Sequence, residues 1–397
     1  MPPYFINNIR VTLMKIKPLV LAISTVLCTP VGMADNTVTA DAAGNYNTIT
    51  ASQEGGDGNS ISITQSNDNN QSSTKQSGNT NAVSVSQSAE GYSYGNGSGV
   101  ANISQVGDSN SVGVHQDNHN SYGSDHYISV AIIDQQGISN STGVFQGYQL
   151  GTNWLTIAQT GYSNGAGINQ FYGNGDSADI SQWGNLNSAS INQTALNSAN
   201  SASISQDNTG GLWGYNTALI TQDIGSGNTA SITQYGSSNK ASISQEGSNS
   251  RATINQQGNY NSASISQTAS NAQAGILQVG DSNSVTIQQT DNTSPQITQS
   301  GSGNTITIND NIWNNQNIQI INQTGDNNTA NVDQSAATNS YVNVNQGGSE
   351  NNSATVSQSG DTNSATINQN TNSDSGHTDI ANIIQSGYSN TITITQQ

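Results

Sequence analysis

The chain has 397 residues, of which 31% are hydrophobic and 8% charged, and its 24 acidic and 6 basic side chains give a formal net charge of −18. Globular domains are about 45–50% apolar and about 25% charged, so a conventional core spread over this length is not expected. The acidic balance argues against nucleic acid and against anionic membrane surfaces, because phosphates are bound through Lys and Arg. Disordered chains usually lack periodicity, whereas this chain is strongly periodic.

The first 34 residues are interpreted as an over-extended start followed by a secretory signal peptide. Met14 is the predicted true start, and it is followed by the basic residues Lys15 and Lys17 and by a short apolar run over residues 19–27. Residues 31–34 offer a cleavage site of small residues. The alternative, a membrane anchor, is disfavoured because the apolar run is too short to span a bilayer.

The mature chain is expected to begin with a short N-terminal segment, residues 35–44. Cys28 is the one cysteine and lies in the leader, so no disulfide is expected in the mature protein. The remaining basic residues would be Lys75, Lys240 and Arg251. No later apolar run is long enough to span a bilayer, so no membrane insertion is expected.

Residues 45–397 repeat a unit of eleven residues, which reads Q-x-G-x-x-N-x-A-x-I-x-Q and is clearest from Gln234 to Gln289. Glycine follows most glutamines by two positions, asparagine by five, a small or β-branched residue by seven, and isoleucine by nine. The predicted structural positions of this run are Gln234, Asn239, Ile243, Gln245, Ile254, Gln256, Asn261, Ile265, Gln267, Gln278, Asn283, Ile287 and Gln289, with turn glycines at Gly236, Gly247, Gly258 and Gly280.

Four insertions are predicted to interrupt the repeat, near residues 88–104, 117–134, 207–221 and 370–384. They are rich in Gly, Asn and Tyr and lengthen the spacing between successive glutamines. One further unit loses its register around Pro295.

Within each unit the Asn, Ala, Ile and Gln positions alternate with Ser and Thr, and this period of two is typical of a strand with one distinctive face. The Gly-rich residues between Gln and Asn are turn formers, with glycine supplying the positive φ. Two units should form one flattened rung of about 22 residues, stacked on the next at about 4.7–4.9 Å. The sequence therefore predicts an all-β protein, a parallel β-solenoid with two strands per rung.

The inward face should combine a thin apolar centre with stacked amides. Buried Asn and Gln can be satisfied by the equivalent amide one rung away, as in cross-β ladders. Soluble repeat proteins need caps, and no capping segment follows the last unit before Gln397. An open edge of parallel strands is a template for another chain, so end-to-end stacking into a cross-β fibre is expected.

This pattern resembles the curlin repeat of the curli subunits of Gram-negative bacteria, and residues 234–245 fit it fully. The resemblance implies a secreted subunit that leaves through a dedicated outer-membrane channel. It further implies polymerisation on a nucleator subunit at the cell surface, in adhesive fibres (fimbriae) of the biofilm matrix. The chain is several-fold longer than an ordinary curlin subunit and lacks a basic C-terminal unit, so it resembles the major subunit more than the nucleating one.

The resemblance also assigns roles to turn residues. In that family the ladder residues drive polymerisation, and turn glycines and aspartates moderate it. The residues that match the moderating aspartates are Asp108, Asp281, Asp326 and Asp361.

Other chemistry is weakly indicated. His115, His119 and His126 lie near several aspartates, but their spacing matches no metal-ligand motif, and solvated histidines in an insertion are the favoured interpretation. A calcium β-roll would need a nine-residue repeat with a different motif. No phosphate loop and no nucleophile motif is present. Neither an enzyme nor a cofactor is expected.

The aromatic residues concentrate in or near the irregular regions. They either form adhesive or carbohydrate-contacting patches or simply cover the sides of the solenoid. They are Tyr92, Tyr94, Tyr122, Tyr127, Tyr148, Trp154, Trp183 and Trp213.

The leading hypothesis, a fibre subunit, has two rivals. A monomeric β-solenoid adhesin or ice-binding protein would use outward threonines such as those of residues 391–395, but most other units carry Ser there. A polysaccharide-active β-helix enzyme would need a charged cluster on one face, which the outward Ser and Thr pattern does not offer.

Overall fold

The computed structural model describes most of the chain, which divides into two compact units, Met1–Ala199 and Asn200–Gln397. Every regular element among the described residues is a β-strand, so that part of the chain contains no helix that could cross a membrane. The described residues are 22–23, 27–28, 36–88, 98–118, 128–148, 151–194, 199–209, 215–290, 292–310, 316–348, 351–370 and 378–396.

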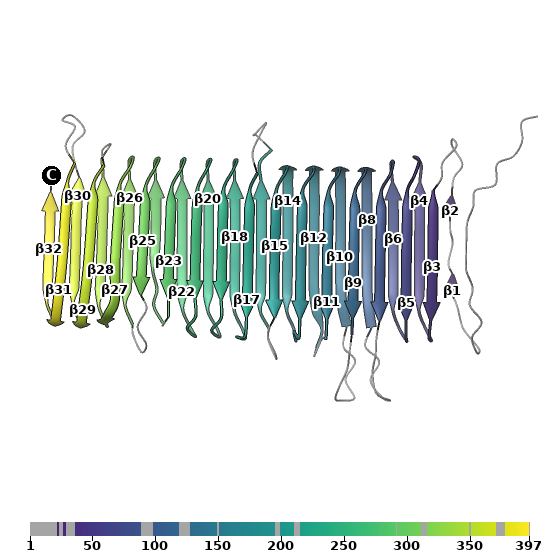
Figure 1. Ribbon diagram of the computed structural model, residues 1–397, viewed down its shortest axis with the longest axis horizontal. Coiled ribbons are helices and arrows are strands. Elements are labelled where there is room, and N and C mark those ends of the chain that lie inside the picture. The colour runs from purple at the N-terminus through teal and green to yellow at the C-terminus, as the bar shows by residue number, and fades with distance from the viewer. Residues whose placement is uncertain are drawn as a thin grey trace, which may run out of the picture. The chain divides into compact units, whose positions relative to one another are not determined.

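In the first unit, successive strands alternate between two parallel sheets, as Figure 1 shows. One sheet holds β1 (Ala22–Ile23), β2 (Leu27–Cys28), β4 (Thr48–Glu54), β6 (Gln71–Ser77), β8 (Ser98–Asp108), β10 (Ile128–Ile138), β12 (Asn153–Tyr162) and β14 (Ser177–Asn185). The other holds β3 (Thr37–Ala43), β5 (Ser60–Ser66), β7 (Ala82–Ser88), β9 (Ser111–Asp117), β11 (Ser141–Gly147), β13 (Gly165–Phe171) and β15 (Ser188–Thr194).

The second unit is built in the same way. Its even-numbered strands are β16 (Ser201–Asp207), β18 (Thr229–Tyr235), β20 (Arg251–Gln257), β22 (Gln273–Val279), β24 (Gln296–Ser300), β26 (Ile318–Thr324), β28 (Tyr341–Gly347), β30 (Ser364–Asn370) and β32 (Thr391–Gln396). Its odd-numbered strands are β17 (Thr217–Asp223), β19 (Lys240–Gln245), β21 (Ser262–Gln267), β23 (Ser284–Gln289), β25 (Thr305–Asp310), β27 (Thr329–Thr338), β29 (Ser353–Asp361) and β31 (Ile380–Tyr388).

Each strand pairs in parallel with the strand two elements along the chain, and identical positions of the repeat stack. Between β20 and β22, for example, Ala252 lies opposite Ala274 and Gln256 opposite Gln278. Paired glutamines are separated by 22 residues in this region, by 21 residues at the shortest rung and by 30 residues where an insertion lengthens the rung. The predicted fold, a parallel β-solenoid with two-strand rungs, is confirmed in both units.

The core is a thin layer of aliphatic side chains with buried amides beside it. Away from the first and last rungs, the inward Ala, Val, Ile, Gln and Asn side chains are buried, whereas inward residues of the end strands such as Ile49, Ile392 and Ile394 are half-buried. Outward positions, mostly Ser and Thr, are half-buried or exposed. The alternation in the sequence thus becomes an alternation in burial, as expected for a pleated strand.

The repeat extends somewhat beyond its sequence pattern. β3 lies in the segment expected to precede the repeats, and it pairs in parallel with β5. Its Ala42 stands where other units have glutamine, opposite Gln65. Pro295 precedes β24, which has only five residues. β27 contains a β-bulge between Asp333 and Ala336.

Two predicted regions lie largely outside the described residues. Within the predicted leader only β1 and β2 are described, and both pair in parallel with β4. The centres of the four predicted insertions, residues 89–97, 119–127, 210–214 and 371–377, also fall outside the description. Strands β8 and β10 begin within the first two predicted ranges.

The packing of the core allows us to predict how much stability is lost when a buried side chain is truncated. Ile243 is fully buried and stacks between Ile220 and Ile265. Replacing Ile243 with Ala should lower the free energy of unfolding by about 2–5 kcal/mol, because the neighbouring rungs cannot collapse into the space. Replacing the outward Ser242 of the same strand with Ala should change it by less than about 0.5 kcal/mol. Urea denaturation of both variants measures the difference. Equal losses of unfolding free energy would contradict the prediction.

Candidate functional site

The stacked glutamines form hydrogen-bonded ladders inside the solenoid. In the odd-numbered sheet the ladder is interrupted after Gln289, which lies opposite Asp310 and donates to Thr293 instead. The Nε2 of Gln256 donates to the Oε1 of Gln278 at 2.8 Å and to the backbone oxygen of Lys240 at 3.1 Å. In the other sheet, Gln245 donates to Gln267 at 2.9 Å. Each amide therefore joins its own sheet to the next rung and also bonds to the opposite sheet. The predicted ladder glutamines of this run are all brought together in this way.

The glutamine ladders have a direction. Each Nε2 donates toward the C-terminal side, so each Oε1 accepts from the N-terminal side. At the N-terminal side the Oε1 atoms of Gln53 and Gln65 are buried without a hydrogen-bond partner. Gln65 faces Ala42, which has no donor in its side chain. A buried acceptor without a partner costs about 1–3 kcal/mol.

The asparagine ladder works differently from the predicted amide-to-amide chain. The backbone N–H of Asn261 donates to the Oδ1 of Asn239 at 3.0 Å. The Nδ2 of Asn239 donates to the backbone oxygens of Gly258 at 2.8 Å and Tyr235 at 3.2 Å. Direct asparagine-to-asparagine bonds also occur, as from Asn283 to Asn261 at 3.1 Å. The asparagines therefore bind mainly the turn backbone, while the glutamines bind one another.

This arrangement explains the turn glycines. Gly236 and Gly258 have φ values of 101° and 113°, and a Cβ on Gly236 would lie 2.1 Å from the oxygen of Gly258. Only glycine lets that oxygen come close enough to accept from Asn239. Gly247 corrects the prediction of a positive φ, since its φ is not left-handed. It is needed for space, because a Cβ there would lie 1.8 Å from the oxygen of Ala269.

Sequence reasoning missed a further left-handed residue in many turns. The residue just before the ladder asparagine often has a positive φ even where it is not glycine, as at Ser238, Tyr260 and Ser282. Such backbone costs free energy, and bonds between rungs hold it in place. The N–H of Ser282, for example, donates to the oxygen of Asn259 at 2.8 Å. No residue type marks this position, which explains why the sequence did not reveal it.

The turn aspartates bind the preceding rung. Asp108, Asp281 and Asp326 each accept a backbone N–H from that rung, at 2.7–2.8 Å. Asp361 instead accepts from the side chains of Asn339, at 3.0 Å, and Thr362. These hydrogen bonds, the one from Asn339 first, lower the pKa of Asp361 below its usual value of 3.8. The aspartates thus help to hold adjacent turns together.

Metal chemistry finds no support in the described part of the chain, where no group of three or more His, Cys, Asp or Glu could hold an ion. His115 is described, whereas His119 and His126 are not. The His115 ring stacks on Phe145, with ring centroids 5.2 Å apart.

Of the predicted aromatic residues, Tyr148, Trp154 and Trp183 are 41%, 54% and 42% exposed. Tyr148 also contacts the rings of Phe171 and Tyr172. The others, Tyr92, Tyr94, Tyr122, Tyr127 and Trp213, lie outside the described residues.

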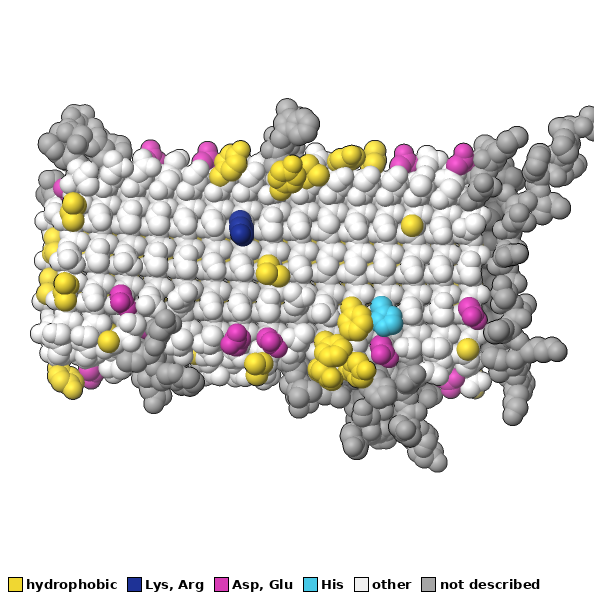
Figure 2. Space-filling model, in the orientation of Figure 1, with side chains coloured by type: hydrophobic (Ala, Val, Ile, Leu, Met, Phe, Trp, Pro, Cys, Tyr) yellow, Lys and Arg dark blue, Asp and Glu magenta, His cyan; other side chains and the backbone are white. Residues whose placement is uncertain are grey.

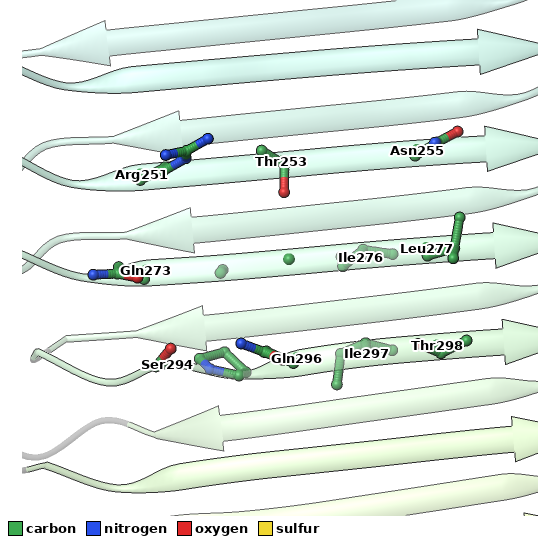
Figure 3. A pocket seen from close by; sticks show the side chains of 13 residues that line it. Arg251, Thr253, Asn255, Gln273, Ile276, Leu277, Ser294, Gln296, Ile297 and Thr298 are labelled. Carbon is green, nitrogen blue, oxygen red and sulfur yellow. The ribbon is translucent and has the colours of Figure 1, made fainter.

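Two shallow grooves interrupt the outer faces where an outward position is glycine. One, in the second unit, has a volume of about 430 Å³ and lies over Gly275. Figure 3 shows it between Arg251 and Thr253 of β20 and Gln296 of β24. The other, in the first unit, has a volume of about 620 Å³ and is lined by Gly143 and Phe145 among others.

The two parallel sheets, the amide ladders and the glycine turns define a β-solenoid repeat protein. The family model of the curlin associated repeat matches residues 214–236, 225–258 and 349–375. The chain is therefore a curlin-repeat protein, as its resemblance predicted. This family and fold are structural rather than catalytic in kind. No curated protein matches the chain.

The ladder predicts different effects for two adjacent glutamines of β20. Replacing Gln256 with Ala removes the donor to Gln278 Oε1 and to the Lys240 oxygen. The buried Oε1 of Gln278, left without this donor, should lower the free energy of unfolding by about 1–3 kcal/mol. Gln257 points outward and is exposed, so Gln257→Ala should have little effect. Chemical denaturation of the two variants compares them, and a similar loss in both would contradict a stabilising ladder.

The turn aspartate predicts a pH dependence. Because folding lowers the pKa of Asp361, its stabilising effect is complete above the unfolded pKa. It is lost as the pH falls through the folded pKa. The urea midpoint should therefore fall on acidification below about pH 4, and less steeply in Asp361→Asn. The control variant is Asp57→Asn. Among the described residues, the Asp57 carboxylate has no set of side-chain donors like the one around Asp361.

Proposed function

We propose that the chain is a secreted structural subunit of curli-type amyloid fibres that supports adhesion and biofilm matrix at the bacterial surface. The observation that carries this proposal is the translational repeat of the ladder. Since each rung presents the same strand edge and the same stacked amides as the rung before it, a rung of another copy can be added by the same bonds.

The polarity of the ladder favours head-to-tail addition. Gln396 accepts from Gln369 at 2.8 Å, and its Nε2 donates only to the backbone of Ile380 among the described residues. If the first rung of a second copy stacked on β31 and β32, Gln53 of that copy would follow Gln396 in the same ladder. The Oε1 of Gln53, which has no partner, could then accept from the Nε2 of Gln396. The inward side chains of Ile392 and Ile394 in β32 are only half-buried, and that copy would cover them.

The predicted leader bears on this addition. β1 and β2 pair with β4, which is the edge that the second copy would need. Cleavage after Ala34 would free this edge. The proposal includes export through an outer-membrane channel and a nucleator subunit as partners, because the curlin-repeat resemblance implies both.

The alternative of a monomeric adhesin or ice-binding surface is less favoured. The outward residues Thr391, Thr393 and Thr395 of β32 are exposed. They lie beside Ser364, Thr366 and Asn368 of β30, so the regular threonine array that such a surface needs does not continue.

The proposal predicts spontaneous assembly. Residues 35–397, diluted from denaturant, should form dye-binding fibres with a meridional spacing of about 4.7–4.8 Å, and these fibres should seed fresh protein. Replacing Gln245, Gln256 and Gln267 with Lys should slow assembly sharply, because three uncompensated charges would enter the ladders. The matched control places Lys at the outward neighbours Ser244, Asn255 and Ser266. A stable monomer that never seeds would reject the proposal.

A further inference from the structure

The outer face of the odd-numbered sheet in the first unit contains a run of three glycines. Gly113, Gly143 and Gly167 lie in register on β9, β11 and β13, with Ser84 and Ser190 next in line on either side. No side chain rises from the sheet at these three positions. The resulting groove of about 620 Å³ crosses the strands, so it follows the direction in which the rungs stack.

One side of this groove is aromatic. The next outward row contains His115, Phe145 and Asn169, again in register. The rings of His115 and Phe145 stack at 5.2 Å between centroids, and Phe145 and Phe171 stack at 6.0 Å. Figure 2 shows the histidine in cyan beside a cluster of hydrophobic side chains on a face that is otherwise mostly polar. His115 is exposed and the two phenylalanines are half-buried, and a cluster of accessible rings of this kind is typical of an interaction site.

The polar groups of the groove are uncharged hydrogen-bonding groups. The Oδ1 of Asn169 is buried and has no hydrogen-bond partner, and Ser84 and Ser86 add hydroxyl groups. No Lys, Arg, Asp or Glu lines the groove. The side chains of Ser84, Ser86 and Asn169 are half-buried or exposed, so their accessible hydroxyl and amide groups can bond to the hydroxyl groups of a ligand. Apolar walls with a few such polar groups are typical of ligand sites.

We propose that this groove binds a strand of neutral polysaccharide that runs across the rungs. The groove crosses several rungs spaced about 4.7–4.9 Å apart, so it suits an extended polymer better than a compact ligand. Its C–H groups would pack against the His115 and Phe145 rings, and its hydroxyl groups would bond to Asn169 and the serines. An acidic polymer fits less well, because the net charge of −18 would repel it.

The binding does not depend on fibre formation, since β9, β11 and β13 belong to one unit of one chain. The proposed subunit would bind the sugar both before and after assembly. Failure to bind glycan and failure to polymerise are therefore distinguishable results.

The glycines offer a test that should preserve the fold. A Cβ on Gly143 would meet nothing within 4 Å, and at Gly113 and Gly167 the nearest atoms lie at 3.9–4.0 Å. None of the three has a left-handed φ. Replacing all three with Thr would fill the groove with the outward residue type of other rungs, and β-branched residues suit strands. Gly275→Thr fills the groove of the second unit and provides the matched control.

The experiment measures binding of the chain to a soluble neutral glucan and to an acidic polyuronate, with unfolding midpoints recorded for every variant. The unaltered chain and Gly275→Thr should bind the neutral glucan and bind the polyuronate less. The triple threonine variant and Phe145→Ser should bind the glucan at least about tenfold more weakly while remaining folded. Equal binding by the triple variant and the unaltered chain would overturn the proposal. A failure of the unaltered chain to bind the glucan would also overturn it. If the triple variant then lost lateral fibre bundling, the groove would be a site for a second copy.

Discussion

The hydrogen bond from one glutamine amide to the next is the interaction on which the structure depends. Only 31% of the residues are hydrophobic, so aliphatic side chains alone cannot fill the interior between the two sheets. The hydrogen-bonded amides fill the rest of it. Stacked amides are buried without penalty only when every donor has an acceptor one rung away. This condition fixes the register of both sheets, because a shift by one residue would turn every glutamine outward.

The other features of the rung follow from that register. Asparagine stands where the turn backbone needs a partner, and glycine stands where the oxygen of the next turn must come close. The turn aspartates tie adjacent turns together outside the ladder. Because all these bonds run from rung to rung, the interactions that fold one chain are of the kind that would join two chains. Under the proposed function, stability and assembly would depend on the same hydrogen bonds.

The outer faces are free of these constraints, and they are where one rung can differ from another. The exposed aromatic rings of the described residues and the two grooves lie outside the ladders. The groove over Gly143 arises where successive rungs omit an outward side chain, which leaves the ladders of those rungs unbroken. Binding properties can therefore vary along the chain while the core stays the same.

The strand period, the inward residues and the parallel stacking could be predicted from the sequence, because each depends on local spacing repeated many times. The sequence also predicted the glutamine ladder from Gln234 to Gln289. Only the tertiary structure decided which atoms the asparagines bind, why Gly247 is needed, and that β3 joins the sheet without its glutamine. It alone also brought His115, Phe145 and Asn169 together. These features depend on contacts between residues some 20–30 positions apart, which no local pattern encodes.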